Sequence, residues 1–212
     1  MRKLRVLIVE EKRLVAAGLK AQLERLGHDF VGSAKDGREA VQSALTIEPD
    51  LIIMRIRTPV VDGIGVARTI LAHKAIPIVV HTPYVSADLV RQAREAGVMA
   101  YLPSPVDRWQ LHSTIELALA RFGELQAIRR EASDLKEAWE TRRLVEQAKG
   151  VLMRRLKLSE AAAFRRMQRQ RRSMGKSLKE MASTILNAEE LFFRRLNVPR
   201  QLQAIRYVIR QG

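Results

Sequence analysis

Cysteine is absent from the 212 residues of this chain, which excludes disulfide bonds and metal sites built on thiolates. The four histidines show no spacing typical of a metal site, so we expect no metal or other cofactor and interpret them as surface or boundary residues: His28, His73, His81 and His112. No apolar run approaches the roughly 20 residues that cross a bilayer, and the sequence enters a strand-like run without a secretory leader. We therefore expect a cytoplasmic protein without membrane contact.

Charge is distributed unevenly along the chain, whose formal net charge is +15. Residues 1–120 hold 16 basic and 13 acidic groups, whereas residues 121–212 hold 22 and 10. A nearly neutral first part and a strongly basic second part indicate two domains with different functions, although a generally basic proteome would also produce an excess. Hydrophobic residues make up 47% of the sequence, which is enough for a core in each part.

Short apolar runs alternate with helical patterns over the first 120 residues. The expected strands are 4–9, 30–32, 51–54, 76–80 and 99–102, and the expected helices are 13–26, 37–47, 64–73, 87–96 and one that begins near 107. This alternation predicts an α/β fold with a five-stranded, parallel, doubly wound sheet covered by helices on both faces. The functional crevice of such a sheet lies beyond the carboxyl ends of its strands, where the sequence places Glu10, Glu11, Arg55, Thr82 and Ser104.

Three features of this part match a known family. The acidic pair Glu10 and Glu11 follows the first strand, and the segment DLIIMRIRTPVVDGI at 50–64 parallels the family's third strand and following turn. Thr82 and Tyr101 stand at the family's hydroxyl and aromatic switch positions. Residues 3–120 thus resemble the receiver domain of two-component response regulators, which implies a flavodoxin-like fold.

Two positions depart from the receiver pattern. Arg55 stands where the resemblance places the phospho-accepting aspartate, and Ser104 stands where it places a lysine. Arginine is a permanent cation without an acceptor lone pair, so the resemblance implies a pseudo-receiver that is not an enzyme and takes its input from a regulatory protein or ligand. The guanidinium either pairs with Glu10 and Glu11, where an active receiver holds magnesium, or points to solvent. The family also predicts a cis peptide bond between Ser104 and Pro105.

The helical pattern that begins near 107 continues beyond the length of a last receiver helix. Its apolar residues follow alternating steps of four and three with one extra three-residue step, and no proline occurs from 107 to 196. This pattern predicts one long helix and a coiled-coil homodimer. The expected contacts are Leu125, Ile128, Leu135 and Trp139. Packing of an amphipathic helix against its own chain is the alternative.

Three short amphipathic helices follow, expected at 140–156, 159–173 and 176–186. Stripes on helices this short must bury against one another, which predicts a small all-α three-helix bundle. From 148 to 186 the sequence has eleven Lys or Arg residues and two acidic residues, a balance typical of a polyphosphate partner.

The bundle also matches a known family. The runs ETRRLVEQAKGVLMRRLKLSEAAAFRRM at 140–167 and SLKEMASTIL at 177–186 resemble the ANTAR domain, an RNA-binding module of bacterial antiterminators, over about residues 136–187. The order of receiver, long helix and ANTAR domain is also known in that family. The resemblance implies a transcription antitermination regulator that binds hairpins in leader RNA. Arg171 and Arg172 depart from the family pattern, which often has Ala-Met there.

Candidate RNA-binding residues follow from charge and size. We expect phosphate contacts from Lys149, Arg154, Arg155, Lys157, Arg165, Arg169 and Lys176. Ala148 and Gly150 are small enough for close approach of an RNA backbone. Met153 would either lie under a splayed base or pack in the core.

Two other functions compete with RNA binding. Gln168 lies among arginines, as in the recognition helix of a DNA-binding helix-turn-helix protein. A dimeric interaction scaffold with a merely solvated basic face is the second.

The expected domains are a receiver-like domain at 1–120, a coiled-coil linker at 121–140, an ANTAR domain at 141–187 and an extension at 188–212. Helices at 188–196 and 199–210 in the extension would cap the bundle or the long helix.

Overall fold

The computed structural model describes residues 2–58, 61–83 and 86–191. The strands are β1 (Arg5–Val9), β2 (Asp29–Ala34), β3 (Leu51–Arg55), β4 (Arg57–Thr58), β5 (Val61–Asp62), β6 (Ile78–Thr82) and β7 (Ala100–Pro103). The helices are α1 (Arg13–Arg25), α2 (Gly37–Ile47), α3 (Gly63–His73), α4 (Ala87–Glu95), α5 (Arg108–Leu156), α6 (Glu160–Met174) and α7 (Leu178–Glu189). The chain divides into two compact units, with the boundary inside α5 between Ile128 and Arg129.

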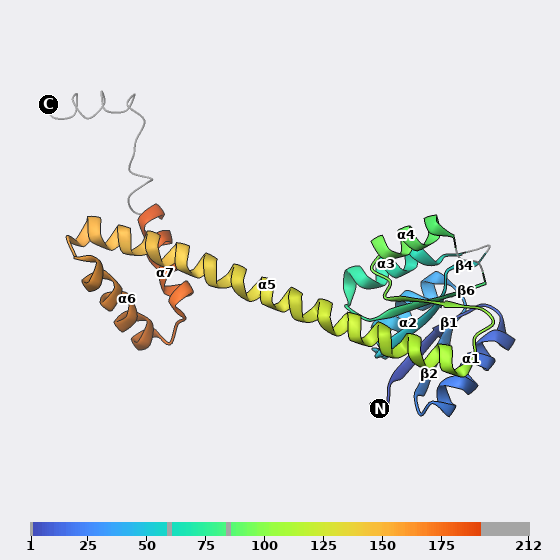
Figure 1. Ribbon diagram of the computed structural model, residues 1–212. Helices are drawn as coiled ribbons and strands as arrows, with labels where there is room; N and C mark the ends of the chain where they lie inside the picture. The colour runs from blue at the N-terminus through green and yellow to red at the C-terminus, as the bar shows by residue number, and fades with distance from the viewer. Residues whose placement is uncertain (1, 59–60, 84–85, 192–212) are drawn as a thin grey trace, which may run out of the picture. The chain divides into compact units, whose positions relative to one another are not determined.

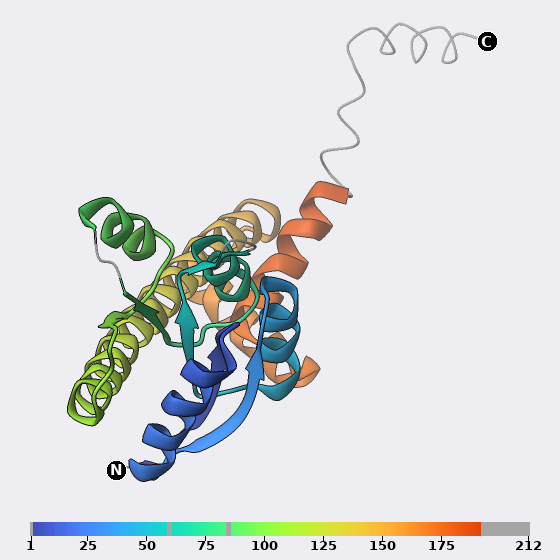
Figure 2. The ribbon, with the colours of Figure 1, turned by 90° about the vertical axis from the view of Figure 1, so that its right-hand side faces the viewer.

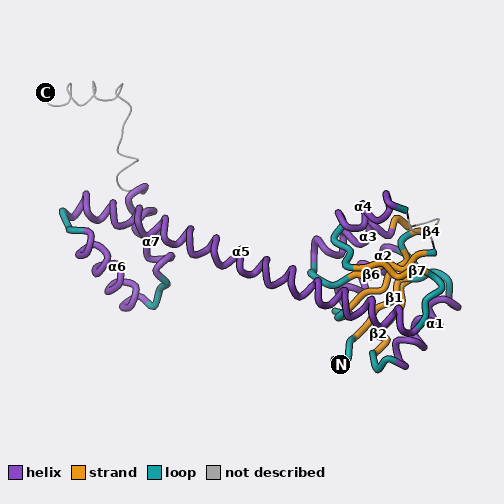
Figure 3. The backbone as a smooth tube through the Cα atoms, viewed as in Figure 1, coloured by secondary structure: helices purple, strands orange, loops and turns teal. Residues whose placement is uncertain are grey.

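The first unit is built on a five-stranded sheet in the order β2-β1-β3-β6-β7, with every neighbouring pair parallel. The predicted alternation of strands and helices is therefore confirmed (Figure 3). The fourth expected strand, at 76–80, is shifted by two residues in the structure, where β6 begins after Pro77 and ends at Thr82. The small antiparallel pair β4-β5 was not predicted, since two-residue strands are too short to show alternation.

Alternate residues of the central strands enter two separate cores. Val6 and Ile8 of β1 pack with α1 and the first turns of α5, whereas Leu7 and Val9 pack on the side of α2 and α3. Figures 1 and 2 show the sheet of this unit between these helices. Because both faces are covered, the inner strands β1, β3 and β6 are mainly apolar, as is typical of parallel sheets.

Helix α5 is continuous over 49 residues, which confirms the prediction of one long helix. Its first turns belong to the sheet's core, where Leu111 and Ile115 are fully buried. Every residue from 127 to 139 is exposed, including the large apolar side chains of Ile128, Leu135 and Trp139 at 62%, 65% and 62% exposure. The described part of the chain therefore covers none of these three side chains.

The second unit consists of the end of α5 with α6 and α7. Its core contains Val145 and Ala148 of α5, Met167 of α6, and Met181 and Ala182 of α7. Ser159 and Ser177 cap the starts of α6 and α7 through their hydroxyl groups, as is common at helix N-termini. Helix α7 ends three residues later than predicted. The expected helix at 188–196 extends beyond the described residues, which end at 191, and the expected helix at 199–210 lies entirely outside them. No helix in the described ranges is both long and apolar enough to cross a membrane.

Candidate functional sites: an ion-paired crevice and a basic helix

An ion pair closes the crevice at the carboxyl ends of β1 and β3. The two strands are neighbours, with Val9 opposite Met54, so the next residues Glu10 and Arg55 emerge side by side. Arg55 Nη1 donates to Glu10 Oε2 at 3.1 Å and to Oε1 at 3.3 Å. The side chains are 15% and 0% exposed, respectively. Of the two orientations that the sequence left open for Arg55, the structure has the paired one, with Glu10 as a partner.

His81 at the end of β6 extends this network. It lies opposite Arg55 in the strand register, and its Nε2–H donates to Glu10 Oε2 at 3.0 Å. The Ser104 hydroxyl lies 2.8 Å from the other ring nitrogen, Nδ1, and forms a hydrogen bond with it. The backbone N–H of Lys12 donates to Glu10 Oε1 at 3.0 Å. Glu10 is thus held by three residues.

The contribution of His81 was missed by sequence reasoning, which placed all four histidines at the surface or boundary. His81 is 2% exposed, and His28 is also buried, at 3%. A signal was present, since His81 directly precedes Thr82 in a strand whose five residues are all buried. A polar side chain in such a strand needs a buried partner.

The network controls the protonation of Glu10. Burial raises the pKa of its carboxyl group, but hydrogen bonds from His81, from the Lys12 backbone and from Arg55, together with the charge of Arg55, outweigh burial and lower the pKa to about 2. Glu10 is therefore ionised at neutral pH, and its charge is balanced by Arg55 inside the fold.

The same arrangement does not fit the magnesium ion of an active receiver. Over the ranges that the structure describes, no group of three or more His, Cys, Asp or Glu residues converges as a metal site. The positive charge against Glu10 is already supplied by Arg55. Hard divalent cations require several oxygen ligands, which this crevice does not present.

The other predicted crevice residues have structural partners. The peptide bond between Ser104 and Pro105 is cis, as predicted. Thr82 is 3% exposed, and its carbonyl oxygen accepts a hydrogen bond from Ser104 N–H at 3.0 Å. The Tyr101 hydroxyl donates to the Leu89 carbonyl oxygen of α4 at 2.7 Å, and burial raises its pKa. Tyr101 therefore connects β7 to α4. Glu11 is half-buried beside the crevice.

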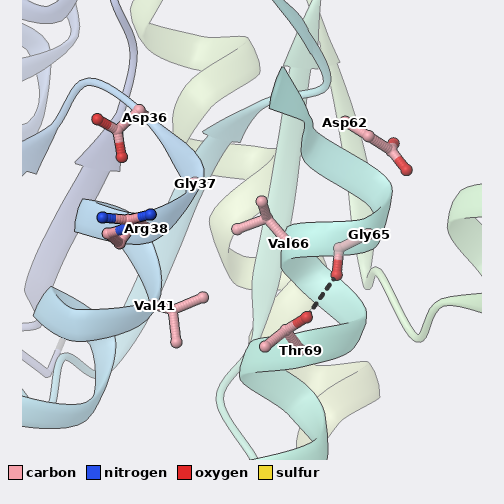
Figure 4. A pocket seen from close by; sticks show the side chains of 8 residues that line it. All are labelled: Asp36, Gly37, Arg38, Val41, Asp62, Gly65, Val66 and Thr69. Carbon is pink, nitrogen blue, oxygen red and sulfur yellow. Dashed lines mark hydrogen bonds between the residues drawn. The ribbon is translucent and has the colours of Figure 1, made fainter. Parts of the chain in front are cut away.

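A separate hollow of about 660 Å³ lies between α2 and α3 (Figure 4). Two aspartates line it, but both cap helices: Asp36 accepts from Glu39 N–H, and Asp62 accepts from Ile64 N–H. Both carboxylates therefore act as N-caps of the helices that follow them. We assign no function to this hollow.

In the second unit, two of the cations expected to contact RNA form ion pairs with carboxylates. Lys149 is 8% exposed, and its Nζ lies 2.6 Å from Glu160 and 2.8 Å from Glu146. Arg155 donates to both carboxylate oxygens of Glu189 on α7 at 3.0 Å. These pairs join α5 to the start of α6 and to the end of α7. Lys149 is therefore almost covered, whereas the Arg155 side chain is 45% exposed, and phosphate contacts of both residues stay predictions.

The small residues of α5 and Met153 have different degrees of exposure. Ala148 is fully buried in the bundle core, where an RNA backbone does not reach it. Gly150 is half-buried. Met153 is 38% exposed, which excludes the simple core position that the sequence left open.

Helix α6 presents the most accessible row of cations. Arg165, Arg169 and Arg172 are exposed and line a hollow of about 290 Å³ together with Gln168. Within the described ranges, none of these three arginines forms an ion pair. Arg171, which departs from the family pattern, is helical because α6 continues to Met174. Its side chain is half-buried.

Comparisons with known proteins match both units. The response regulator receiver domain matches residues 6–116, and the ANTAR domain matches residues 133–186. The chain is 42% identical over 182 residues to the transcriptional regulatory protein PdtaR of Mycobacterium tuberculosis, covering 86% of this chain and 89% of that protein.

Solved structures match the first unit. The signal receiver domain of a modulated diguanylate cyclase from Desulfovibrio desulfuricans G20 is 34% identical, with a TM-score of 0.53, and the match covers 57% of this chain and 98% of that one. A LuxR-family response regulator from Aurantimonas sp. SI85-9A1 is 28% identical, with a TM-score of 0.53 and coverage of 56% and 86%. The chain therefore belongs to the response regulators that join an N-terminal receiver domain to a C-terminal ANTAR domain.

Proposed function

We propose that this protein is a transcription antitermination regulator that binds hairpin RNA through its ANTAR bundle at 141–187. The observation that carries the proposal is the row of exposed arginines on α6, at Arg165, Arg169 and Arg172, within the residues that match the ANTAR domain. Within the described ranges these arginines have no carboxylate partner, whereas Lys149 and Arg155 form ion pairs with carboxylates of the bundle.

The geometry of the row suits a phosphate backbone. Spacings of four and three residues keep the arginines on one side of α6, and a rise of about 1.5 Å per residue spreads them over about 10 Å. Each guanidinium can bind a phosphate through two parallel N–H groups. Neutralising several phosphates releases counterions and gives affinity that falls with salt.

Further contacts complete the proposed surface. Arg154, Lys157 and Lys176 belong to it because no carboxylate in the described ranges pairs with them. The partly exposed Met153 on α5 offers an apolar surface for a splayed loop base, and Gly150 lies one turn before it. Hairpin loops expose bases in this way, whereas an A-form stem hides its major groove.

We also propose that the receiver domain at 1–120 works without phosphotransfer. Arg55 stands at the family's phospho-acceptor position, and a guanidinium has no lone pair with which to attack a phosphoryl group. Its ion pair with the buried Glu10 supports a crevice that holds its own cation permanently. The regulator is then a non-enzymatic one, whose input is a ligand or regulatory protein.

The linker region of α5, at 121–140, is proposed to form a homodimer through Leu125, Ile128, Leu135 and Trp139. The last three are more than 60% exposed although they are large and apolar. The four residues are separated by three, seven and four positions, which is the spacing of a coiled-coil seam. A second copy of the helix would remove this apolar surface from water.

A binding experiment tests the RNA assignment. We expect the full chain to bind a hairpin RNA more tightly than a DNA duplex of equal length at the same salt concentration, because affinity for any polyanion makes a single Kd uninformative. Replacing the row by Arg165→Gln, Arg169→Gln and Arg172→Gln should weaken hairpin binding and reduce the slope of log Kd against log salt by up to about three.

A matched control removes the same three charges elsewhere. Arg129→Gln, Arg130→Gln and Lys136→Gln change exposed residues of α5 outside the proposed surface and should leave the hairpin affinity nearly unchanged. Equal losses in both triple variants would show that only net charge matters. A DNA duplex that binds a hundredfold more tightly than any hairpin would instead favour a helix-turn-helix function centred on Gln168.

A further inference from the structure

A cavity of about 400 Å³ lies beside the ion-paired crevice in the first unit. One side of α1 forms a wall, with Val15, Gly18, Leu19 and Gln22 at steps of three and four. The opposite wall is the segment that follows β7, at Ser104, Pro105 and Val106, and Pro83 adds to the apolar lining. Lys12, Arg55 and His81 complete the lining at the crevice. The cavity therefore has an apolar middle and a polar, cationic end.

The charged lining has one sign. Lys12 and Arg55 are cations, and no carboxylate belongs to the lining. Glu10 is fully buried behind Arg55 and already receives hydrogen bonds from Arg55, His81 and the Lys12 backbone. The start of α1 adds to this end, since its N-cap Lys12 provides no side-chain cap for the first N–H groups of the helix. This end of the cavity complements a negative charge.

Glycine keeps the middle of the cavity open. Gly18 lies in the interior of α1, where glycine costs about 1 kcal/mol relative to alanine. A Cβ atom built at Gly18 would meet no atom within 4 Å, so the fold does not require glycine for lack of space. A side chain at this position would occupy the cavity.

The far end carries an unsatisfied acceptor. Gln22 Nε2 donates to the Val106 carbonyl oxygen at 2.8 Å, which fixes the orientation of the amide. Gln22 Oε1 is buried and has no hydrogen-bond partner in the described part of the chain. The Gln22 amide thus joins α1 to the segment after β7 at this end of the cavity.

We propose that this cavity binds a small amphipathic organic anion, with its carboxylate or phosphate at Lys12 and Arg55 and its apolar body between α1 and Val106. The volume lies in the lower part of the usual range for small-molecule sites, which suits one ring and a short acid chain. The site gives the receiver unit a ligand input at the edge of the crevice. It does not depend on RNA binding by the second unit.

Calorimetric titration of the full chain with 4-phenylbutyrate tests the proposal. We expect saturable binding, and about tenfold weaker binding of 4-phenylbutan-1-ol, which has the same apolar body without the charge. Inorganic phosphate distinguishes an anion site from an amphipath site and should bind at least about tenfold more weakly than 4-phenylbutyrate. Lys12→Gln should weaken 4-phenylbutyrate by several-fold, whereas its neighbour Arg13→Gln, which removes the same charge outside the lining, should not.

Filling the cavity provides the second arm. Gly18→Leu should abolish 4-phenylbutyrate binding, whereas Gly123→Leu, the same change at a glycine of α5 whose Cβ also meets nothing, should retain it. Circular dichroism checks that both variants fold, and the smaller Gly18→Ala provides a milder filling. Absence of saturable binding, equal binding of the alcohol or of phosphate, or full binding by folded Gly18→Leu would each overturn the proposal.

Discussion

Removing Arg55 should expose the energetic role of the internal ion pair. Arg55→Met keeps much of the side-chain length but deletes the cation that lies 3.1 Å from the Glu10 carboxylate. Glu10 would remain buried, with hydrogen bonds only from His81 and the Lys12 backbone. A buried carboxylate that loses its cation is destabilising, because no water replaces the lost partner.

The magnitude follows from the pKa of Glu10. A pKa of about 2 in the folded chain, against 4.5 for the ordinary group, corresponds to about 3 kcal/mol of stability at neutral pH. His81 and the Lys12 backbone supply most of it, so we assign about 1 kcal/mol to Arg55. Since the folded pKa lies below the unfolded one, this stability is fully present above about pH 4.5 and is lost as pH falls toward 2.

A double-mutant cycle measures the pair directly. Arg55→Met, Glu10→Gln and the double variant are compared at pH 7 through hydrogen exchange of the β3 and β6 amides against urea, which reports the first unit alone. We expect a coupling energy of about 1 kcal/mol. The exposed pair of Lys20 and Glu24, at 3.8 Å in the same unit, is the control and should give less than about 0.5 kcal/mol.

Two results would refute this reasoning. A coupling energy between Arg55 and Glu10 no larger than that of the Lys20 and Glu24 control would mean that the buried pair does not stabilise the fold. An unchanged loss of stability between pH 4.5 and 2 in Glu10→Gln would mean that another group causes the acid sensitivity.

Three further outcomes are expected. Incubation with acetyl phosphate and magnesium should add no phosphoryl group by intact-mass measurement, and Arg55→Asp alone should restore little because Ser104 is uncharged; a stoichiometric base-labile adduct on the wild type would contradict this. Leu135→Asp should weaken self-association by several kcal/mol in light scattering, whereas exposed Lys136→Asp should not, and a wild type that is monomeric at micromolar concentration would remove the coiled-coil argument. Gly18→Ala should raise the stability of the first unit by about 1 kcal/mol without ligand, and a loss would show that the cavity cannot accept a methyl group.

Much of the fold could be predicted from the spacing of apolar residues and from the positions of proline and glycine in the sequence. Branched runs separated by helical stripes predicted the parallel sheet, and the absence of proline from 107 to 196 predicted the continuous α5. The two-residue strands β4 and β5 were missed because they carry no period. The end of α7 was placed too early because no glycine or proline marks it in the sequence.

The sites were less predictable, because they depend on which side chains meet. The crevice position of Arg55 followed from strand ends, but the partnership of His81 with Glu10 depends on strand order and register. On the basic surface, charge count alone did not distinguish cations with internal partners. Lys149 and Arg155 pair with carboxylates 11 and 34 residues away, contacts that no local pattern reveals. The additional pair of Lys149 with Glu146, three residues before it, follows the ordinary helical spacing.

Sequencing the nucleic acid that co-purifies with the protein from its own cells tests the central claim most directly. After ultraviolet crosslinking, the wild type should retain RNA enriched in hairpin-forming segments, and the variant Arg165→Gln, Arg169→Gln, Arg172→Gln should lose most of it. The control variant Arg129→Gln, Arg130→Gln, Lys136→Gln should retain the same RNA. Recovery of specific DNA would contradict the account. Recovery of RNA that is not enriched in hairpins, in equal amounts by the wild type and both variants, would also contradict it.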